Sequence, residues 1–482
     1  MLIAQIEPAH RTHGGDWFYR TASPGKAMAA LPGVFVVDLT NIHRARERIL
    51  READVVVLNM LADVDLLAVV AERRARGLVT VYELNDDCAA VQPWNPVHAF
   101  FANRDNLRVW LRLAHTCNAI QFCTSELVRL YGYLNAKYVV FPNQLATVPR
   151  LEAPRTPGTG LVLGWGGSHG HLEDMASLVE PLSSWLRQHP EVSLAIMGSD
   201  PIQALFAEIP GVRLVPAGTL DDYNVFVGSL DIGLAPLADT GFNRCRSDVK
   251  FLEYASHGAV AVLQRLAPYE ATVREPQTAL LFSSTGELLA SLDALVADPQ
   301  KRFDLRARAH GYVSAERREG KHAAARTAFY RSLGAGSRPQ ADRLFRELLR
   351  LSDASRDGRH LELRGGRYEA LVHDALVVGQ LNGQRAEGLA LLEEATRLEP
   401  TLYQPDLFAS VMTEEPGELL LAAAKKNSRS VGVWLQLASF FERGGNAQAA
   451  VGNLLRAAEL VPAYEAPYRR LGELLERMGD KV

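Results

Sequence analysis

The stretch that decides the fold is residues 161–175, LVLGWGGSHGHLEDM. It predicts a short apolar strand, a glycine-rich turn that contains Gly164, Gly166 and Gly167, and a helix whose apolar side begins at Leu172. A glycine turn that leads into a helix directs backbone N–H groups and the helix dipole at an anion. A tight turn capped by Ser168 produces the same pattern without a ligand, so both interpretations stay open at this point.

The same alternation of strand and helix continues on both sides of this stretch. The expected strands are short, apolar on both faces and rich in β-branched residues, which is typical of a parallel sheet covered by helices. The sequence therefore predicts two successive doubly wound α/β domains. The expected strands are 2–8, 34–39, 54–60, 78–84, 119–124 and 137–143 in the first domain and 161–165, 193–198, 212–218, 231–237, 259–264 and 279–282 in the second.

Two tracts predict the domain boundaries. Residues 147–160, TVPRLEAPRTPGTG, and residues 334–343, GAGSRPQADR, are rich in residues that interrupt helices and strands. We expect Rossmann-like domains at 1–150 and 151–333, a linker or helical connector at 334–366, and helical repeats at 367–482.

The last segment contains a repeat of 34 residues. With Trp434 as the fourth position of a unit, the small and large apolar residues fall where a tetratricopeptide repeat places them, and this segment resembles that family. A generic antiparallel helical bundle is the alternative interpretation. The matching positions are Leu437, Ala438, Phe441, Ala450, Leu454, Ala457 and Pro462.

Composition narrows the class of protein. The chain has 482 residues with 52 Lys and Arg against 56 Asp and Glu, so no global basic excess attracts nucleic acid. The four cysteines form no C-x-x-C pair, which indicates a reducing compartment and no cysteine zinc site. No apolar run is long enough for a transmembrane segment, and the first residues lack the order of a signal peptide. We therefore expect a soluble, cytoplasmic protein.

A second polar group follows the expected strand at 231–237. In FNRCRSDVKFLEYASHGAVAV, residues 242–262, Ser247 is a good N-cap and Gly258 a good helix stop, which places Arg246 at the start of a short helix that carries Lys250 and Glu253. Two cations near a glycine turn can hold a diphosphate, and a carboxylate can accept both hydroxyls of a ribose. An exposed ion pair on a helix surface is the alternative.

These motifs resemble the sugar-donor half of retaining GT-B glycosyltransferases of the large family-four group. The segments that carry the resemblance are GWGGSHGHLED, residues 164–174, DIGLAPL with the FN at residues 242–243, and SDVKFLEYASHGAVAV, residues 247–262; VYELNDD, residues 81–87, is similar to the acceptor-binding half. The resemblance implies a nucleotide-diphosphate sugar bound by the second domain, an acceptor bound mostly by the first, and transfer with retention. It also implies that no metal and no tightly bound cofactor is needed.

The resemblance also assigns roles to residues. It implies that Gly167 and Ser168 bind the phosphates, that Lys250 is the cation of the helix, and that Glu253 binds the ribose. Ser168 and His171 replace the Arg and Lys that many members have after this turn, and both can donate to the phosphates. The first glutamate of the family's E-x7-E pair falls on Cys245, and Asn243 or Asp248 is the expected substitute. Arg246 and Lys250 would stabilise the charge on the departing nucleotide.

Two features of the first half are candidates on the acceptor side. His98 is a candidate for polarising the acceptor hydroxyl, although a lone histidine is more often structural. Asp86 and Asp87 can do the same or cap the next turn, and we predict no metal there.

We therefore expect a glycosyltransferase whose acceptor is a protein recruited by the helical repeats. The alternatives are a polysaccharide or lipid-linked glycan acceptor, with the repeats used for homo-oligomerisation or another protein partner, and an inactive GT-B scaffold protein.

Overall fold

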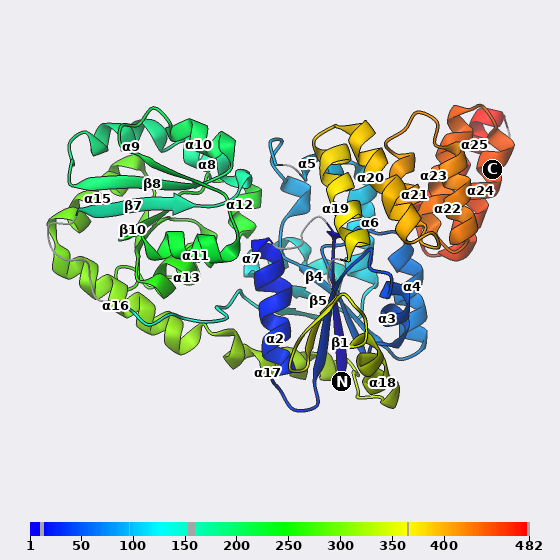
Figure 1. Ribbon diagram of the computed structural model, residues 1–482, viewed down its shortest axis with the longest axis horizontal. Coiled ribbons are helices and arrows are strands. Elements are labelled where there is room, and N and C mark those ends of the chain that lie inside the picture. Colours follow the sequence, from blue (N-terminus) through cyan, green and yellow to red (C-terminus); the bar gives the residue numbers. More distant parts are fainter. Residues whose placement is uncertain (10–13, 96, 153–159, 364–365, 480–482) are drawn as a thin grey trace.

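The computed structural model describes residues 1–9, 14–95, 97–152, 160–363 and 366–479. It contains two α/β domains followed by a helical domain (Figure 1). Residues 153–159 of the expected interdomain linker lie outside the described part. In the described part, no helix is both long enough and apolar enough to cross a bilayer.

The first domain is built on the six parallel strands that the sequence predicts. Their order is β2-β1-β3-β4-β5-β6, and each strand pairs in parallel with its neighbours. The strands are β1 (Leu2–Glu7), β2 (Phe35–Thr40), β3 (Val55–Asn59), β4 (Val79–Leu84), β5 (Ala119–Phe122) and β6 (Tyr138–Val140). The helical segments are α1 (Gly15–Trp17), η2 (Phe18–Ala22), α2 (Ser23–Ala29), α3 (Arg46–Glu52), α4 (Asp65–Ala75), η3 (Cys88–Ala90), α5 (His98–Ala102), α6 (Arg104–Thr116), α7 (Ser125–Tyr131) and η4 (Gly132–Leu134).

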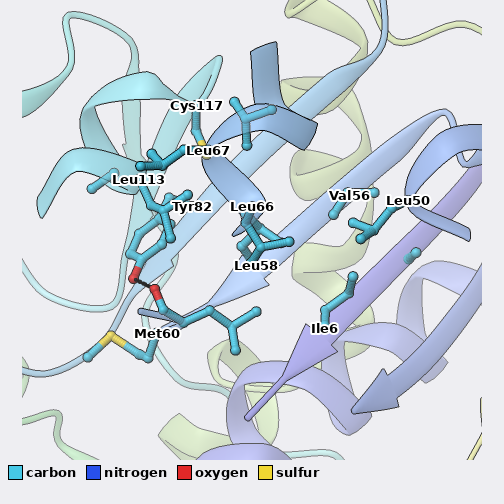
Figure 2. Close-up of a cluster of buried hydrophobic side chains, with 14 of the residues drawn as sticks. Ile6, Leu50, Val56, Leu58, Met60, Leu66, Leu67, Tyr82, Leu113 and Cys117 are labelled. Atoms are coloured by element: carbon cyan, nitrogen blue, oxygen red, sulfur yellow. Dashed lines mark hydrogen bonds between the residues drawn. The ribbon is translucent and has the colours of Figure 1, made fainter. Parts of the chain in front are cut away.

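The first sheet is buried on both faces, as the apolar strands require. Figure 2 shows part of one face, where Leu58 and Val56 of β3 meet Leu50 of α3 and Leu66 of α4. Tyr82 lies in the same core, and its hydroxyl donates a hydrogen bond of 2.7 Å to the carbonyl of Leu61.

The second domain repeats the design with a six-stranded parallel sheet in the order β12-β11-β10-β7-β8-β9. All six expected strands are present: β7 (Leu161–Gly166), β8 (Val192–Gly198), β9 (Arg213–Pro216), β10 (Ile232–Ala235), β11 (Val260–Gln264) and β12 (Leu280–Phe282). The helical segments are η5 (His169–His171), α8 (Leu172–Ala176), α9 (Val179–Leu186), α10 (Asp200–Phe206), α11 (Leu220–Gly228), α12 (Gly241–Cys245), α13 (Val249–His257), α14 (Ala267–Glu270), α15 (Thr285–Ala297) and α16 (Pro299–Glu316).

The chain then returns to the first domain, which differs from the expected connector. Helix α17 (Glu319–Ser332) packs on α2, and α18 (Pro339–Leu348) follows it. Strand β14 (His360–Leu363) pairs in parallel with β2, and β13 (Ala354–Asp357) pairs antiparallel with β14. The first sheet therefore has eight strands. The physical reason is burial, because Leu361 and Leu363 are fully buried at this edge of the sheet.

The segment from residue 367 is helical, as expected. Helices α23 and α24 pack closely on each other, and the predicted small positions Ala438 and Ala450 are fully buried between helices. The tetratricopeptide register itself stays a prediction. The helical segments are α19 (Arg367–Ala375), η6 (Leu376–Leu381), α20 (Arg385–Leu398), α21 (Gln404–Ser410), α22 (Gly417–Lys426), α23 (Val431–Arg443), α24 (Ala447–Leu460) and α25 (Glu465–Met478).

Candidate functional site

A cavity of about 1160 Å³ lies where the carboxyl ends of the two sheets face each other. The loops that follow β1, β3 and β4 line it from the first domain, and the loop after β7 together with α13 lines it from the second. Residues of α21 and α23 complete the wall. Ligands of open α/β sheets bind outside the carboxyl ends of the strands, so this cavity is the candidate active site.

The glycine turn after β7 reaches the cavity through Gly167 and Ser168. A Cβ atom on Gly167 would lie 2.6 Å from the Trp165 ring, so only glycine fits there. Its N–H group donates to the carbonyl of Met197 and extends the pairing with β8. Ser168 occupies the N-cap position of η5, but its side chain makes no capping bond. The structure thus does not favour the interpretation of Ser168 as a cap.

Arg246 and His171 form a hydrogen-bonded pair at the cavity wall. Arg246 Nη1 lies 3.0 Å from His171 Nε2, and His171 Nδ1 lies 2.8 Å from the carboxylate of Asp174. Burial, followed by the charge of Arg246, lowers the pKa of His171 to about 4. The neutral ring therefore donates from Nδ1 to Asp174 and accepts from Arg246, which holds the guanidinium in place.

Asn243 lies behind this pair. Its Nδ2 donates to Asp174 Oδ1 at 2.9 Å, and its Oδ1 accepts from Arg246 Nε at 2.9 Å. Asn243 is 1% exposed and is not part of the cavity wall. The structure places it as a support for Arg246, whereas the sequence suggested direct contact with the sugar donor.

Lys250 and Glu253 project from α13 into the same cavity. Lys250 Nζ lies 3.1 Å from Glu253 Oε2 and 2.6 Å from the hydroxyl of Tyr223. Their side chains are 15% and 7% exposed, so the alternative of an exposed surface ion pair is wrong. Because both side chains are largely buried, the attraction between the two charges is stronger than it is at a protein surface.

Glu253 also joins the two domains. Tyr19 of the first domain donates to Glu253 Oε1 at 3.1 Å, and Tyr223 donates to Oε2 at 2.6 Å. Burial and the charge of Glu253 raise the pKa of both phenols well above the ordinary value, so both stay protonated donors. A ribose that binds Glu253 must share this carboxylate with the two tyrosines or displace them.

Cys245, which stands in the place of the missing glutamate, and Asp248, one of its two expected substitutes, are both held away from the cavity wall. Cys245 is 1% exposed, and burial raises the pKa of its thiol to about 12. Asp248 is buried and forms an ion pair of 2.7 Å with Arg317. Neither side chain lines the cavity.

The three candidates on the acceptor side, Asp86, Asp87 and His98, have different surroundings in the structure. Asp86 lines the cavity, whereas Asp87 caps η3 by accepting from the N–H of Ala89 and from the hydroxyl of Tyr131. His98 Nδ1 lies 2.9 Å from the carbonyl of Val91, and this histidine is half-buried outside the cavity wall. The capping interpretation thus holds for Asp87.

One group of metal-ligand type occurs among the described residues, and none of its three members lines the cavity. His43 Nε2 is 3.1 Å from Asp353 and 3.6 Å from Glu369. The N–H of Ala45 donates to His43 Nδ1, so the neutral ring carries its proton on Nε2 and donates to Asp353. This arrangement is that of a hydrogen-bonded network.

Sequence reasoning missed Tyr19, Tyr223 and Asp174 as parts of the site. Asp174 lies within residues 161–175, three positions after His171 at the start of an expected helix. This spacing, which brings two side chains together on a helix, was the signal for the pair. The two tyrosines belong to no motif, and only the tertiary structure brings them to Glu253.

Comparisons with known proteins agree with this architecture. No family model and no curated protein matches the chain. Among solved structures, HepE of Anabaena in complex with UDP and glucose is similar at a TM-score of 0.51, with 13% identity over 69% of this chain and 100% of that chain. Sucrose-phosphate synthase of Thermosynechococcus elongatus is similar at 0.51, with 15% identity over 70% and 100%.

A glycosyltransferase of Rickettsia africae is similar at a TM-score of 0.50, with 11% identity over 70% of this chain and 99% of that chain. Each of these similarities spans about 70% of this chain. The comparisons confirm the expected GT-B arrangement of two Rossmann-like domains. The helices from α19 onward confirm the expected all-α domain.

Proposed function

We propose that this protein is a glycosyltransferase that moves a sugar from a nucleotide-diphosphate donor to an acceptor hydroxyl. The observation that carries the proposal is the convergence of Arg246, Lys250 and Glu253 with the Gly167–Ser168 turn on one cavity between two Rossmann-like domains. The similarity to a structure that holds UDP and glucose supports a uridine nucleotide as the first sugar donor to test.

The chemistry follows from the charges of the site. Departure of a nucleotide diphosphate develops negative charge on the leaving oxygen, and Arg246 and Lys250 supply preorganised positive charge beside it. His171 and Asn243 keep the guanidinium oriented before the sugar donor arrives. Retention is part of the proposal: in a same-face transfer the leaving phosphate takes the acceptor proton, so the scheme needs no protein nucleophile.

The proposal includes a protein acceptor that the tetratricopeptide-like helices recruit. Its support is that residues of α21 and α23 belong to the cavity wall. A glycan acceptor is the competing candidate. An inactive scaffold is a further candidate, because Cys245 stands where the resemblance expects a glutamate.

A panel of UDP, GDP, dTDP and ADP with the full-length chain tests the proposal. We expect at least one nucleotide to raise the melting temperature, because a ligand at a hundred times its Kd stabilises the folded state by about 2.7 kcal/mol. If none of the four shifts the melting temperature, the enzyme proposal fails and the scaffold alternative gains support.

Variants of the nucleotide site sharpen this test. Lys250→Ala removes a charge-assisted contact worth about 1.5–3 kcal/mol, so we expect the nucleotide Kd to rise about 10- to 100-fold. Glu253→Gln keeps the shape and removes the charged acceptor, and we expect a smaller rise. Lys26→Ala is the matched control, because Lys26 is 57% exposed and lies outside the cavity. Unchanged binding by both site variants would refute the assignment of the site.

A further inference from the structure

The far end of the cavity lies at the junction of the first sheet and the C-terminal helices. Five polar residues line it there, and we call them the junction cluster: Arg46, Asp63, Asp65, Tyr403 and Gln404. Arg46 begins α3, Asp65 begins α4 and Gln404 begins α21. The cluster therefore joins elements more than 300 residues apart in the chain and is separate from the nucleotide site.

Most of the cluster is already held by hydrogen bonds. Arg46 Nη2 donates to Asp63 Oδ2 at 2.7 Å. Asp65 accepts from the hydroxyl of Tyr403 at 2.7 Å and from the N–H of Gly432 at 3.0 Å. These bonds fix the side chains before a ligand arrives, which is the condition for a preorganised binding site.

Two buried polar atoms of the cluster lack a hydrogen-bond partner in the described part of the chain, although one of them, Arg46 Nε, lies 3.9 Å from the carboxylate of Glu47. Gln404 is 5% exposed and Arg46 is 2% exposed, yet Gln404 Oε1 and Arg46 Nε have no hydrogen-bond partner among the described residues. Nearly all buried polar groups in proteins are hydrogen-bonded. The unpaired acceptor and the unpaired donor both belong to residues of the cavity wall, so they call for a ligand that offers an N–H or O–H together with a carbonyl or hydroxyl oxygen.

The remaining wall of the cavity indicates the chemical class. Val411 and Phe100 line it and are 49% and 44% exposed. Leu407 of α21, four residues before Val411, lines it as well. The amides of Gln380 and Gln436 line the same region. Aliphatic pockets suit the side chains of a peptide better than the hydroxyl-covered rim of a glycan, and amide side chains pair with both groups of a peptide bond.

We propose that the junction cluster is an acceptor subsite that binds the backbone of an extended polypeptide, whose hydroxyl-bearing residue lies at the nucleotide end of the cavity. The C-terminal helices thereby form part of the site where transfer occurs. This proposal rests on the proposed function, because it assumes that the protein transfers a sugar.

The test offers the full-length chain two acceptor pools. One is a degenerate pool of ten-residue peptides that contain Ser or Thr, and the other is a pool of neutral oligosaccharides. Both are incubated with radiolabelled UDP-, GDP-, dTDP- and ADP-sugars, and transfer of label is measured. We expect label in the peptide pool.

Variants then locate the subsite. We expect Gln404→Leu to raise the KM for the selected peptide about tenfold, with kcat and the nucleotide-induced melting shift unchanged. Gln436→Leu, at an exposed position of the same wall, is the second variant and should raise KM in the same direction. Gln448→Leu is the matched control, because Gln448 is exposed on α24 outside the cavity.

The outcomes separate the two proposals. Label only in the oligosaccharide pool, or no label in peptides despite a normal nucleotide-induced shift, overturns the polypeptide subsite alone. An unchanged KM in both cavity variants overturns it as well. Absence of any nucleotide-induced shift in the unmodified chain overturns the proposed function and the subsite with it.

Discussion

The imidazole of His171 lies between a carboxylate and a guanidinium, with Asp174 on one ring nitrogen and Arg246 on the other. Its burial lowers the pKa to about 4, so the ring is neutral across the physiological range. A neutral ring leaves the full positive charge of Arg246 for the cavity, whereas an imidazolium would repel the guanidinium from its place.

This pKa predicts how stability depends on pH. The unfolded chain binds a proton at His171 below pH 6.5, and the folded chain does so only near pH 4. Stability from this group is therefore full above pH 6.5 and falls as the pH drops toward 4, by up to about 3 kcal/mol. We expect His171→Gln to show a shallower loss of unfolding free energy between pH 7 and pH 4.5, measured by urea denaturation.

His322→Gln is the control, since His322 lies on α17 outside the cavity. It should keep the slope of the unmodified chain. Equal slopes for His171→Gln and the unmodified chain would contradict the assignment of a depressed pKa to His171.

Among the elements, the short hairpin of β13 and β14 contributes buried residues to the first domain. Leu361 and Leu363 are fully buried against β2, and His360 Nε2 lies 2.7 Å from the buried carboxylate of Asp38. The hairpin covers an edge that β2 would otherwise expose, which also protects the sheet against pairing with other chains.

We expect Leu361→Ala to destabilise the first domain by about 2–5 kcal/mol, because it deletes a fully buried side chain and leaves a cavity. The loss is measured as a lower midpoint in chemical denaturation. Glu362→Ala is the neighbouring control, since Glu362 is half-buried on the same strand. A loss below about 1 kcal/mol for Leu361→Ala would show that the hairpin is dispensable.

The hairpin also shows what the sequence predicts and what it does not. The twelve core strands are predictable because most of them are apolar runs, as VFVVDL is. The strand ASRD is polar and exposed, and HLEL has four residues, so neither shows a period. The partner of β14, β2, lies more than 300 residues earlier, and no local signal encodes such a pairing.

The candidate site also has parts that the sequence predicts and parts that it does not. The glycine turn and the helix with Lys250 and Glu253 can be predicted from the local sequence, because the residues that start and stop a turn or helix lie within a few positions of it. Asn243 carries no such signal, because its partner Asp174 is 69 residues away. Its position behind Arg246 depends on how the loop before α13 packs against the loop after β7, which is a property of the folded chain.

The whole molecule is joined more tightly than three separate domains would be. Val431, Ala457, Val461, Tyr464 and Ala466 of the C-terminal helices belong to the same buried cluster as the strands of the first sheet. The cavity wall likewise takes residues from all three parts. The helical domain therefore acts as a structural part of the first domain.

A chain that ends at residue 366 tests this view. It exposes the apolar surface that the five residues cover, so we expect a melting temperature at least about 5 °C lower and increased binding of a hydrophobic dye. A chain that ends at residue 463, which lacks only α25 among the described helices, should lose less. An unchanged melting temperature for the shorter chain would establish an independent helical module.

The return of the chain from the second domain to the first has a consequence for synthesis. The second sheet is complete once β12 has left the ribosome, but the first sheet, although it begins at residue 2, lacks β14 until residue 363. At about 5–20 residues per second, the edge of β2 waits roughly 16–65 s for its partner. The second domain of this protein can thus finish folding before the first, and the edge of β2 stays open for pairing with other chains until β14 arrives.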